Sequence, residues 1–392
     1  MKRIALSTLS LALIGAAGAA HAQSSVTLYG IIDTSLTYVN HVNGSNKQWS
    51  ISNTNSGDLS GSRWGLKGQE DLGGGLAAIF QLENGFDPGN GKLNQGNREF
   101  GRQAYVGLQS SQYGTVSLGR QYDPLVDLVQ GITADNYFGS LFATPGDVDN
   151  YDNSSRVNNA VRYLSPNFGG LQIEGMYAFG GVAGSTGSGQ TWSLAAAYTK
   201  GPLAIAGGYF VADNANTGAL RSAGWSPTST SDGPFDGDVI NSGFQSAKSI
   251  NIARIAAQYT IGAFTVGAGY SNSQYKADGY SLFGSTEKFN TGQAFVNYQA
   301  ASALLLGLGY SYMKASGETS ATYNQISAGA DYSLSKRTDI YLVGAWQRAN
   351  GQTLVQNGTT TSVESAVASV GSYGYNGTNT QAIVSLGLRH KF

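Results

Sequence analysis

The sequence predicts an all-β protein, a transmembrane antiparallel β-barrel of about sixteen strands. Apolar and polar residues alternate with period two over many segments of about ten residues, which is the period of a β-strand. The connections between these segments are alternately short and long, as in barrels with tight turns at one end and long loops at the other. Beyond the N-terminus, no apolar run approaches the ~18 residues of a membrane helix.

Residues 1–22 have the pattern of a secretory signal peptide. Two basic residues precede an apolar run at 4–13, and an A-x-A pattern at 20–22 predicts cleavage before Gln23. The apolar run is too short for a membrane anchor. We therefore expect residues 23–392 to form the barrel domain and to leave the cytoplasm.

The first mature segment shows the alternation clearly. Val26, Leu28 and Ile32 share one face, and Asp33 and Thr37 share the other. Similar patterns predict strands at approximately 26–39, 62–72, 76–86, 98–109, 115–121, 157–164, 171–179, 190–199, 203–211, 251–261, 264–274, 288–298, 303–312, 323–334, 339–347 and 381–392.

The polar face of these strands decides between a membrane barrel and a soluble β-sandwich. It carries mainly Thr, Ser, Gln, Asn, Gly and ionised groups, whereas a sandwich needs an apolar inner face. A sheet of this size must protect its edges, and closure into a barrel of about 16–18 strands does so around an aqueous channel. Only a closed barrel satisfies every backbone group of a β-structure in lipid.

Composition excludes several other classes of protein. Of the 392 residues none is Cys, so disulfides, thiolate metal sites and thiol nucleophiles are excluded. A formal net charge of −1 argues against a nucleic-acid partner. After signal removal only His41 and His390 remain, and no G-x-S-x-G segment occurs, so we expect no enzyme. An EF-hand is rejected at 147–158, because Gly and Glu are missing where that loop requires them. We expect no cofactor or dedicated metal site, and weak binding of divalent cations by the acidic loop stays an open alternative.

Several segments together resemble the trimeric general porins of Gram-negative bacteria, most closely those of β-proteobacteria. These segments are VTLYG at 26–30, SRWGLKG at 62–68, RQAYVGL at 102–108, GR at 119–120, NAVRY at 159–163 and GLRHKF at 387–392. The resemblance implies a homotrimer of sixteen-stranded barrels in the outer membrane, in contact with its lipid and lipopolysaccharide. It also implies that Phe392 is a signal for the barrel-assembly machinery.

In this family the third long loop folds into the barrel and narrows it. The corresponding loop here is 122–156, whose acidic residues are Asp123, Asp127, Asp135, Asp147, Asp149 and Asp152. The resemblance makes Arg63, Arg102 and Arg156 the wall arginines opposite these carboxylates. It places Arg120 towards a neighbouring subunit, and we therefore leave Arg120 out of the pore.

Alternation tests these assignments independently. Arg63 lies on the polar face of its strand together with Lys67, and Arg156 lies on the polar face of its strand together with Arg162. Asp33 lies on the polar face of the first strand. We therefore expect all five side chains in the lumen. Arg102 instead shares its parity with apolar residues, so alternation alone would not direct it inward.

The expected function is a water-filled channel for passive diffusion of ions and small hydrophilic solutes. Opposed charges across a narrow lumen orient polar solutes and bias ion selectivity. The acidic loop and a mature chain with more acidic than basic residues predict weak selectivity with a slight cation preference. The alternatives are a porin selective for oligosaccharides or organic anions and, less favoured, an adhesin or enzyme of barrel form.

Overall fold

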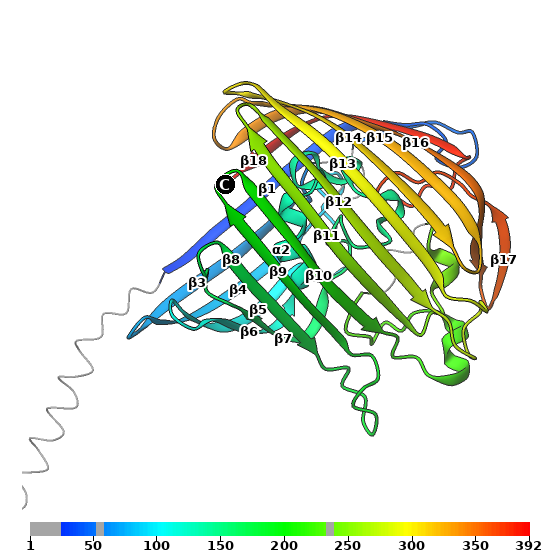
Figure 1. Cartoon of the computed structure of the whole chain (residues 1–392), viewed down its shortest axis with the longest axis horizontal. Coiled ribbons are helices and arrows are strands. Elements are labelled where there is room, and N and C mark those ends of the chain that lie inside the picture. The colour runs from blue at the N-terminus through cyan, green and yellow to red at the C-terminus, as the bar shows by residue number, and fades with distance from the viewer. Residues whose placement is uncertain (1–24, 52–58, 233–238) are drawn as a thin grey trace, which may run out of the picture.

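Each long strand pairs antiparallel with the next, and the last returns to the first, so that the sheet closes into a tilted barrel (Figure 1). The computed structural model describes residues 25–51, 59–232 and 239–392. The expected signal peptide, 1–22, lies outside the described residues and stays a prediction. At the seam, Ile32 pairs with His390 and Leu36 with Leu386.

Sixteen strands form the closed ring. They are β1 (Ser25–Val39), β3 (Arg63–Gly73), β4 (Leu76–Gly85), β5 (Gln103–Ser110), β6 (Gly114–Gln121), β7 (Val157–Leu164), β8 (Leu171–Ala178), β9 (Thr191–Lys200), β10 (Leu203–Asp213), β11 (Ser249–Ile261), β12 (Phe264–Lys276), β13 (Glu287–Ala301), β14 (Leu304–Ser316), β15 (Ser320–Ser333), β16 (Thr338–Asn357) and β18 (Thr380–Lys391). The predicted fold class is confirmed.

Two further strands extend the wall at the end that carries the long loops. They are β2 (Gln48–Ile51), which pairs with β1, and β17 (Thr360–Ser365), which pairs with the end of β16. The sequence pattern missed both, and it ended β16 near residue 347, because beyond the membrane both faces of a strand are polar and alternation fades. At the opposite end the turns are tight, and Gly73, Gly74 and Gly75 take φ values of 81°, 63° and 79° that favour glycine.

The two faces of the wall differ as expected for a membrane barrel. Large apolar side chains such as Leu28, Val106, Leu308 and Leu386 are exposed on the outside. The inward positions of the same strands carry mostly polar groups, exemplified by the Thr37 hydroxyl 2.8 Å from that of Ser385. No helix among the described residues is both long and apolar enough to cross a membrane.

Short helices lie in the loops, and most of them belong to the third loop inside the barrel (Figure 1). The third-loop helices are α2 (Pro124–Leu128), η1 (Gln130–Ile132), α3 (Asp135–Phe138), η2 (Gly139–Phe142) and η3 (Pro145–Asp147), and η4 (Gly218–Ala223) and η6 (Ser242–Phe244) follow β10. Together these loops bury an apolar cluster inside the barrel, with Leu125, Phe244, Tyr275 and Phe289 among its members. The lumen is therefore partly filled, and its open part is displaced towards β3–β7.

Candidate pore constriction

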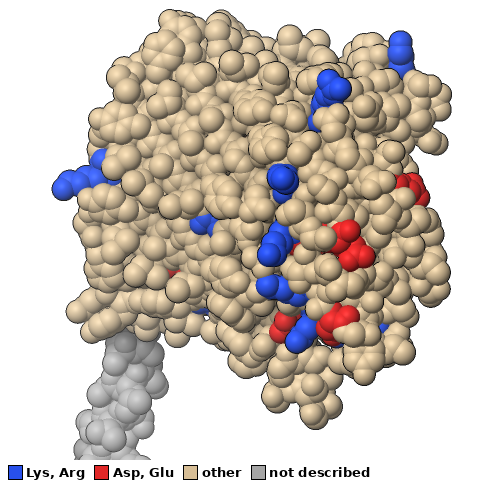
Figure 2. All heavy atoms as spheres, turned by 45° about the vertical axis from the view of Figure 1, so that its right-hand side comes forward, with Lys and Arg blue, Asp and Glu red and all other residues tan. Residues whose placement is uncertain are grey.

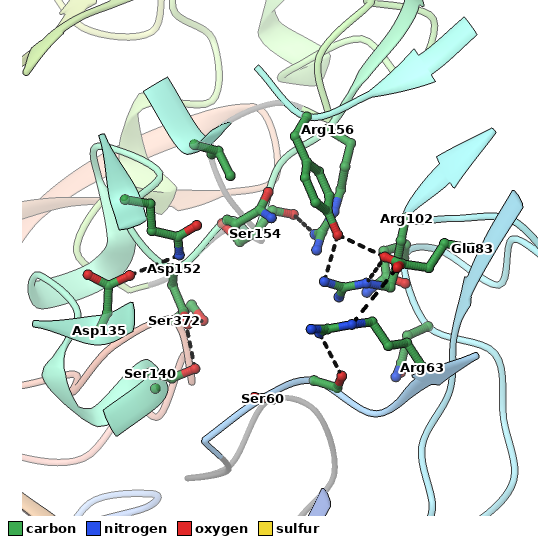
Figure 3. A pocket seen from close by; sticks show the side chains of 18 of the residues that line it. Ser60, Arg63, Glu83, Arg102, Asp135, Ser140, Asp152, Ser154, Arg156 and Ser372 are labelled. Atoms are coloured by element: carbon green, nitrogen blue, oxygen red, sulfur yellow. Dashed lines mark hydrogen bonds and ion pairs between the residues drawn. The ribbon is translucent and has the colours of Figure 1, made fainter. Parts of the chain in front are cut away.

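A cavity of about 740 Å³ separates the third loop from the wall formed by β3–β7. Arg63, Arg102 and Arg156 line one side of this cavity, and Asp135 and Asp152 line the other (Figure 3). The structure thus brings together the three arginines and part of the acidic set that the sequence analysis singled out.

The arginines converge because each stands where a strand begins. Arg63 is the first residue of β3, whereas Arg102 and Arg156 immediately precede β5 and β7. Their guanidinium groups gather around the ring of Tyr122, with the Arg102 and Arg156 centres 5.7 and 5.5 Å from the ring centroid. Such contacts hold cations near one another at a modest gain for each pair.

Glu83 of β4 anchors this arginine group. The Arg102 Nε donates to Glu83 Oε1 over 2.7 Å, and the Arg63 Nε lies 3.9 Å from Oε2. The Tyr122 hydroxyl bridges the same groups, since it accepts from Arg102 over 2.7 Å and donates to Glu83 over 3.0 Å. The Glu83 carboxylate therefore neutralises mainly Arg102. Much of the positive charge of Arg63 and Arg156 is not balanced by acidic groups of the wall.

The inward position of Arg102 corrects the parity expected from alternation. The strand begins at Gln103 rather than at 98, so Arg102 lies in the preceding loop, where the two-residue period does not apply. Its side chain turns inward to Glu83, while Val106 and Leu108 keep the outward parity.

The loop side of the cavity carries carboxylates held by hydroxyl and amide donors. Asp135 accepts from the Thr133 hydroxyl at 2.5 Å and from the Gln130 amide at 2.9 Å. Asp152 accepts from the hydroxyls of Ser140 and Ser372, at 2.7 and 2.6 Å. Both carboxylates are thereby fixed in place without an arginine partner.

Burial changes the ionisation of this loop. It raises the pKa of Asp135 to about 7, although the hydrogen bonds from Thr133 and Gln130 act in the opposite direction. Burial likewise raises the pKa of Asp152 and, with the nearby Asp152 and Asp149 charges, raises that of Asp147 well above its usual range. The loop is consequently less negative at neutral pH than its sequence indicates.

Three of the six aspartates are placed away from the cavity lining. Asp123 caps α2 by accepting from the Leu125 N–H at 2.8 Å. Asp147 accepts from the Asp152 N–H at 2.7 Å, and Asp149 accepts from Thr144 at 2.5 Å. These carboxylates stabilise the path of the loop, because buried backbone donors and hydroxyls need acceptors wherever water is excluded.

Asp127 lines the cavity but is paired. Its carboxylate binds the guanidinium of Arg162 on β7, and Arg162 also lies 3.4 Å from Glu174 on β8. Arg162 therefore faces the lumen side of the wall, where it fastens α2. The Lys67 Nζ lies 5.5 Å from the centre of the Tyr29 ring, outside the cavity lining.

Asp33 is inward but fully buried against the wall. It accepts from the Tyr341 hydroxyl at 2.6 Å and from the Ser60 N–H at 2.8 Å. Asp33 lies outside the cavity lining. Its hydrogen bond with Tyr341 links β1 to β16, and the residue does not border the constriction.

The far side of the loop is fastened to β11–β15. The Phe138 ring packs over Gly307 and Gly329, where an added Cβ would overlap it. The Gln325 amide donates to the carbonyls of Leu141 and Ala143 at 3.1 and 3.0 Å. These contacts press the loop against one side of the barrel and leave its acidic edge facing the arginines.

Arg254 of β11 makes a second attachment. Its guanidinium lies 3.4 Å from the centre of the Tyr151 ring and donates to the Asn150 carbonyl at 3.2 Å. Arg254, Glu83 and Tyr122 were not among the residues predicted from the sequence. Inward parity was a usable signal for Arg254 and Glu83, whereas Tyr122 lies in a loop without periodicity.

Arg120 is absent from the cavity lining, in a bulge after Gly119. It binds Asp232 with a shortest N–O distance of 2.6 Å, and Arg98 reaches the same carboxylate at 3.2 Å. No group of three or more His, Asp or Glu among the described residues is arranged to hold a metal ion.

Comparison with known proteins places this architecture in a family. A family model described as Gram-negative porin matches residues 8–352. The chain belongs to the Gram-negative porins. This porin is 30% identical to an outer membrane porin protein of Bordetella pertussis, over 89% of this chain and 94% of the relative. It is 29% identical to outer membrane porin protein 32 of Delftia acidovorans, over 98% and 99%.

Solved structures agree with the fold of this porin. An anion-selective porin from Comamonas acidovorans superposes with a TM-score of 0.70 at 25% identity, covering 94% of this chain and all of the other. OmpT of Vibrio cholerae superposes with a TM-score of 0.64 at 16% identity, covering 95% and 100%. The porin is therefore an outer-membrane channel, as predicted, and the Gram-negative outer membrane is its location.

Proposed function

We propose that the constriction of this porin is a charged filter that passes ions and small hydrophilic solutes with a preference for anions. The observation that carries the proposal is the group of Arg63, Arg102 and Arg156 facing Asp135 and Asp152 across the cavity (Figure 3). A transverse field of this kind orients polar solutes, and the uncompensated sign sets the ion preference.

The sign of the preference follows from which charges are paired. Arg63 and Arg156 share little of the Glu83 charge, whereas Asp127 is neutralised by Arg162. Burial raises the pKa of both remaining loop carboxylates, and Asp135, with a pKa of about 7, is partly protonated near neutral pH. The slight cation preference expected from sequence counted all six aspartates as pore charges, and we now propose the opposite sign. The anion selectivity of the Comamonas acidovorans porin is consistent with this.

The test is the reversal potential of single channels in a KCl gradient. The proposal expects a sign that corresponds to faster permeation of chloride. A potential at zero, or one of the cation-selective sign, would refute the filter while leaving the channel itself intact.

Raising the pH from about 6 to about 8 is expected to weaken the anion preference. Asp135, with a pKa of about 7, is mostly neutral at the lower pH and mostly ionised at the higher one, while the arginines stay charged. The constriction thus gains negative charge as the pH rises. Reversal potentials at both pH values measure the change, and Asp135→Asn is expected to reduce it. An equal change in that variant would assign the titration to another group.

We propose that the porin is a homotrimer, for which its outer surface gives a physical reason. The exposed large side chains within β1, β5, β6 and β18 are all aliphatic, whereas β7–β16 expose many Tyr and Trp. Aromatic residues mark lipid–water interfaces, so the aliphatic face is suited to packing against other subunits. A trimer form is described for OmpT of Vibrio cholerae, which has the same fold.

Cysteine labelling can test this face, because the native chain contains no cysteine. Val106→Cys on β5 and Leu308→Cys on β14 replace exposed residues on the two faces. With a fluorescent label and brominated lipids, we expect strong quenching at 308 and weak quenching at 106, since subunit contact excludes lipid. Equal quenching at both positions would contradict the proposed interface.

We also propose that Phe392 takes part in recognition by the barrel-assembly machinery. Its backbone pairs with Gly30 through two hydrogen bonds of 3.0 Å, and its ring stays 41% exposed at the seam. Phe392→Ala is expected to lower the amount of folded porin in the outer membrane severalfold and to leave refolding in detergent nearly unchanged. Phe264→Ala, at another exposed phenylalanine at the turn end, is the control. If both variants lost the same amount of folded porin from the outer membrane, the Phe392 ring would have only a structural role.

We propose that this porin has no catalytic activity, because its family and its fold are those of channels. The two histidines of the barrel support this, since His41 bonds the Thr380 carbonyl at 2.6 Å and His390 lies 2.9 Å from the Thr338 hydroxyl. They belong to opposite ends of the wall and share no site. Outer-membrane lipid and lipopolysaccharide remain the expected surroundings of the outer face.

A further inference from the structure

Two of the constriction arginines lie just outside the regular strand pairing of the wall. Arg102 and Arg156 immediately precede β5 and β7. The Arg102 side chain is held by Glu83 at 2.7 Å, but the Arg156 side chain donates only to the Ser154 carbonyl, at 3.0 Å, and its Nε has no hydrogen-bond partner among the described residues. Because Ser154 belongs to the same loop, the position of the Arg156 charge depends on how its backbone is held.

A short segment of the β10–β11 loop lies beside the start of β7, and we call residues 230–232 the strap. Thr230 accepts from the Asn158 N–H at 2.7 Å, and its own N–H donates to the Gly189 carbonyl at 3.1 Å. The strap is therefore fixed from β7 on one side and from the β8–β9 loop on the other.

Asp232 joins the strap to the backbone of Arg156. Its carboxylate accepts from the Arg156 N–H at 3.2 Å, and its own N–H donates to the Ser155 hydroxyl at 3.2 Å. Both contacts are made to the two residues that lead into β7. The strap thus supplies the backbone partners that the strand ladder does not supply at this point.

Arg120 of β6 holds Asp232 in this place. Its Nη2 donates to the Asp232 carboxylate at 2.6 Å, and its Nη1 donates to the Asn158 side chain at 2.7 Å. Its Nε donates to the carbonyl of Gly101, the residue before Arg102, at 2.8 Å. The planar guanidinium fork therefore connects the strap with the segments that carry both arginines.

We propose that the ion pair of Arg120 and Asp232 is a positioning clamp for the constriction, which holds Arg156 and, to a smaller extent, Arg102 opposite the acidic loop. Neither residue of the clamp lines the cavity, so the pair acts through the backbone that it holds. The resemblance to known porins instead assigns Arg120 to a contact with a neighbouring subunit. The inference rests on the proposed charged filter.

The opposite charges of the two clamp residues distinguish positioning from a direct effect of charge. If the pair acts by position, Arg120→Met and Asp232→Ala both release the segment before β7, and both shift the ion preference in the same direction. If the residues act through their own charges, loss of the cation lowers the anion preference and loss of the carboxylate raises it.

The experiment measures reversal potentials in a KCl gradient for wild type, Arg120→Met, Asp232→Ala and the double variant. Moving a unit charge by about 3 Å, from about 6 Å away from a passing ion and at an effective dielectric constant of about 40, changes permeation about twofold. We therefore expect each variant to lower the chloride-to-potassium permeability ratio about twofold or more. The double variant is expected to resemble the single ones, because all three break the same clamp.

The matched control is a second ion pair in the long loops. Figure 2 shows basic and acidic side chains gathered on the part of the surface that these loops form, next to a largely uncharged wall. The Arg221 Nη2 lies 3.2 Å from Asp278 Oδ2, and neither residue lines the cavity. Arg221→Met and Asp278→Ala remove the same kinds of charge and are expected to keep the wild-type permeability ratio.

Opposite shifts in the two single clamp variants would overturn the proposal, as would equal shifts in the control variants. An unchanged ratio would overturn it too, and a loss of trimers in detergent alongside would assign Arg120 to the subunit contact. Should Arg120→Met fail to fold, Arg120→Lys replaces it, because lysine keeps the charge and lacks the planar fork. We expect Arg120→Lys to lower the ratio, and a wild-type ratio in that variant would overturn the clamp.

Wild-type porin tests the charged filter separately. The clamp is judged from the direction of the shift between variants, which does not depend on the sign of the wild-type preference. A wild-type channel without anion preference would therefore count against the filter, whereas an anion-preferring wild type with unshifted variants would count against the clamp.

Discussion

The double variant Arg63→Gln/Arg156→Gln is expected to change the porin from anion-preferring to cation-preferring. These arginines line the cavity, and the wall supplies little negative charge to either. A unit charge about 6 Å from a passing ion, at an effective dielectric constant of about 40, contributes about 1.4 kcal/mol, which is about tenfold in permeation. Removing two such charges leaves Asp135 and Asp152 as the unpaired groups. The measurement is the reversal potential in a KCl gradient.

A charge-matched control separates the constriction from the overall charge of the molecule. Lys336→Gln/Arg337→Gln removes the same charge from an exposed turn far along the chain from the cavity lining. The control is expected to keep the wild-type reversal potential. If both double variants behaved alike, the arginines would not set the selectivity.

The single variant Arg102→Met is expected to be the most destabilising change at the constriction. It removes the 2.7 Å partner of the buried Glu83 carboxylate and leaves that charge with the Tyr29 hydroxyl and the more distant Arg63, 3.9 Å away. Breaking a buried ion pair in this way costs about 3–5 kcal/mol. Unfolding by guanidinium in detergent, followed by tryptophan fluorescence, measures the loss.

The matched variant for this test is Arg102→Met/Glu83→Gln. Because the buried carboxylate that lost its closest cation is removed with that cation, we expect most of the stability to return. The four species form a double-mutant cycle, and additive effects in that cycle would show that Glu83 and Arg102 are not coupled.

Local patterns predicted the strands because alternation is a property of neighbouring residues. Arg63 could be placed in the lumen in this way, since it begins β3 on the polar face of that strand. Alternation predicted the wrong direction for the Arg102 side chain, because Arg102 precedes its strand. It also did not predict the position of Arg120, because the bulge after Gly119 changes the strand register there. Both failures occur where the regular ladder stops.

The third loop shows a different limit. Its acidic composition and the facing arginines were apparent from the sequence, but six aspartates looked alike. The structure uses Asp123, Asp147 and Asp149 to hold the loop together, and it turns Asp135 and Asp152 to the cavity. No periodicity distinguishes these two sets.

The order of the residues along the chain was enough to predict a membrane barrel, because strand period, face polarity and connection length are local properties. Which charges oppose each other across the pore depends instead on how the folded chain packs. Contacts between distant residues set the path of the loop, such as Phe138 over Gly307 and Gly329 and Arg254 against Tyr151. The ionisation of Asp135 depends on the same long-range packing, since burial by residues far apart in the chain raises its pKa.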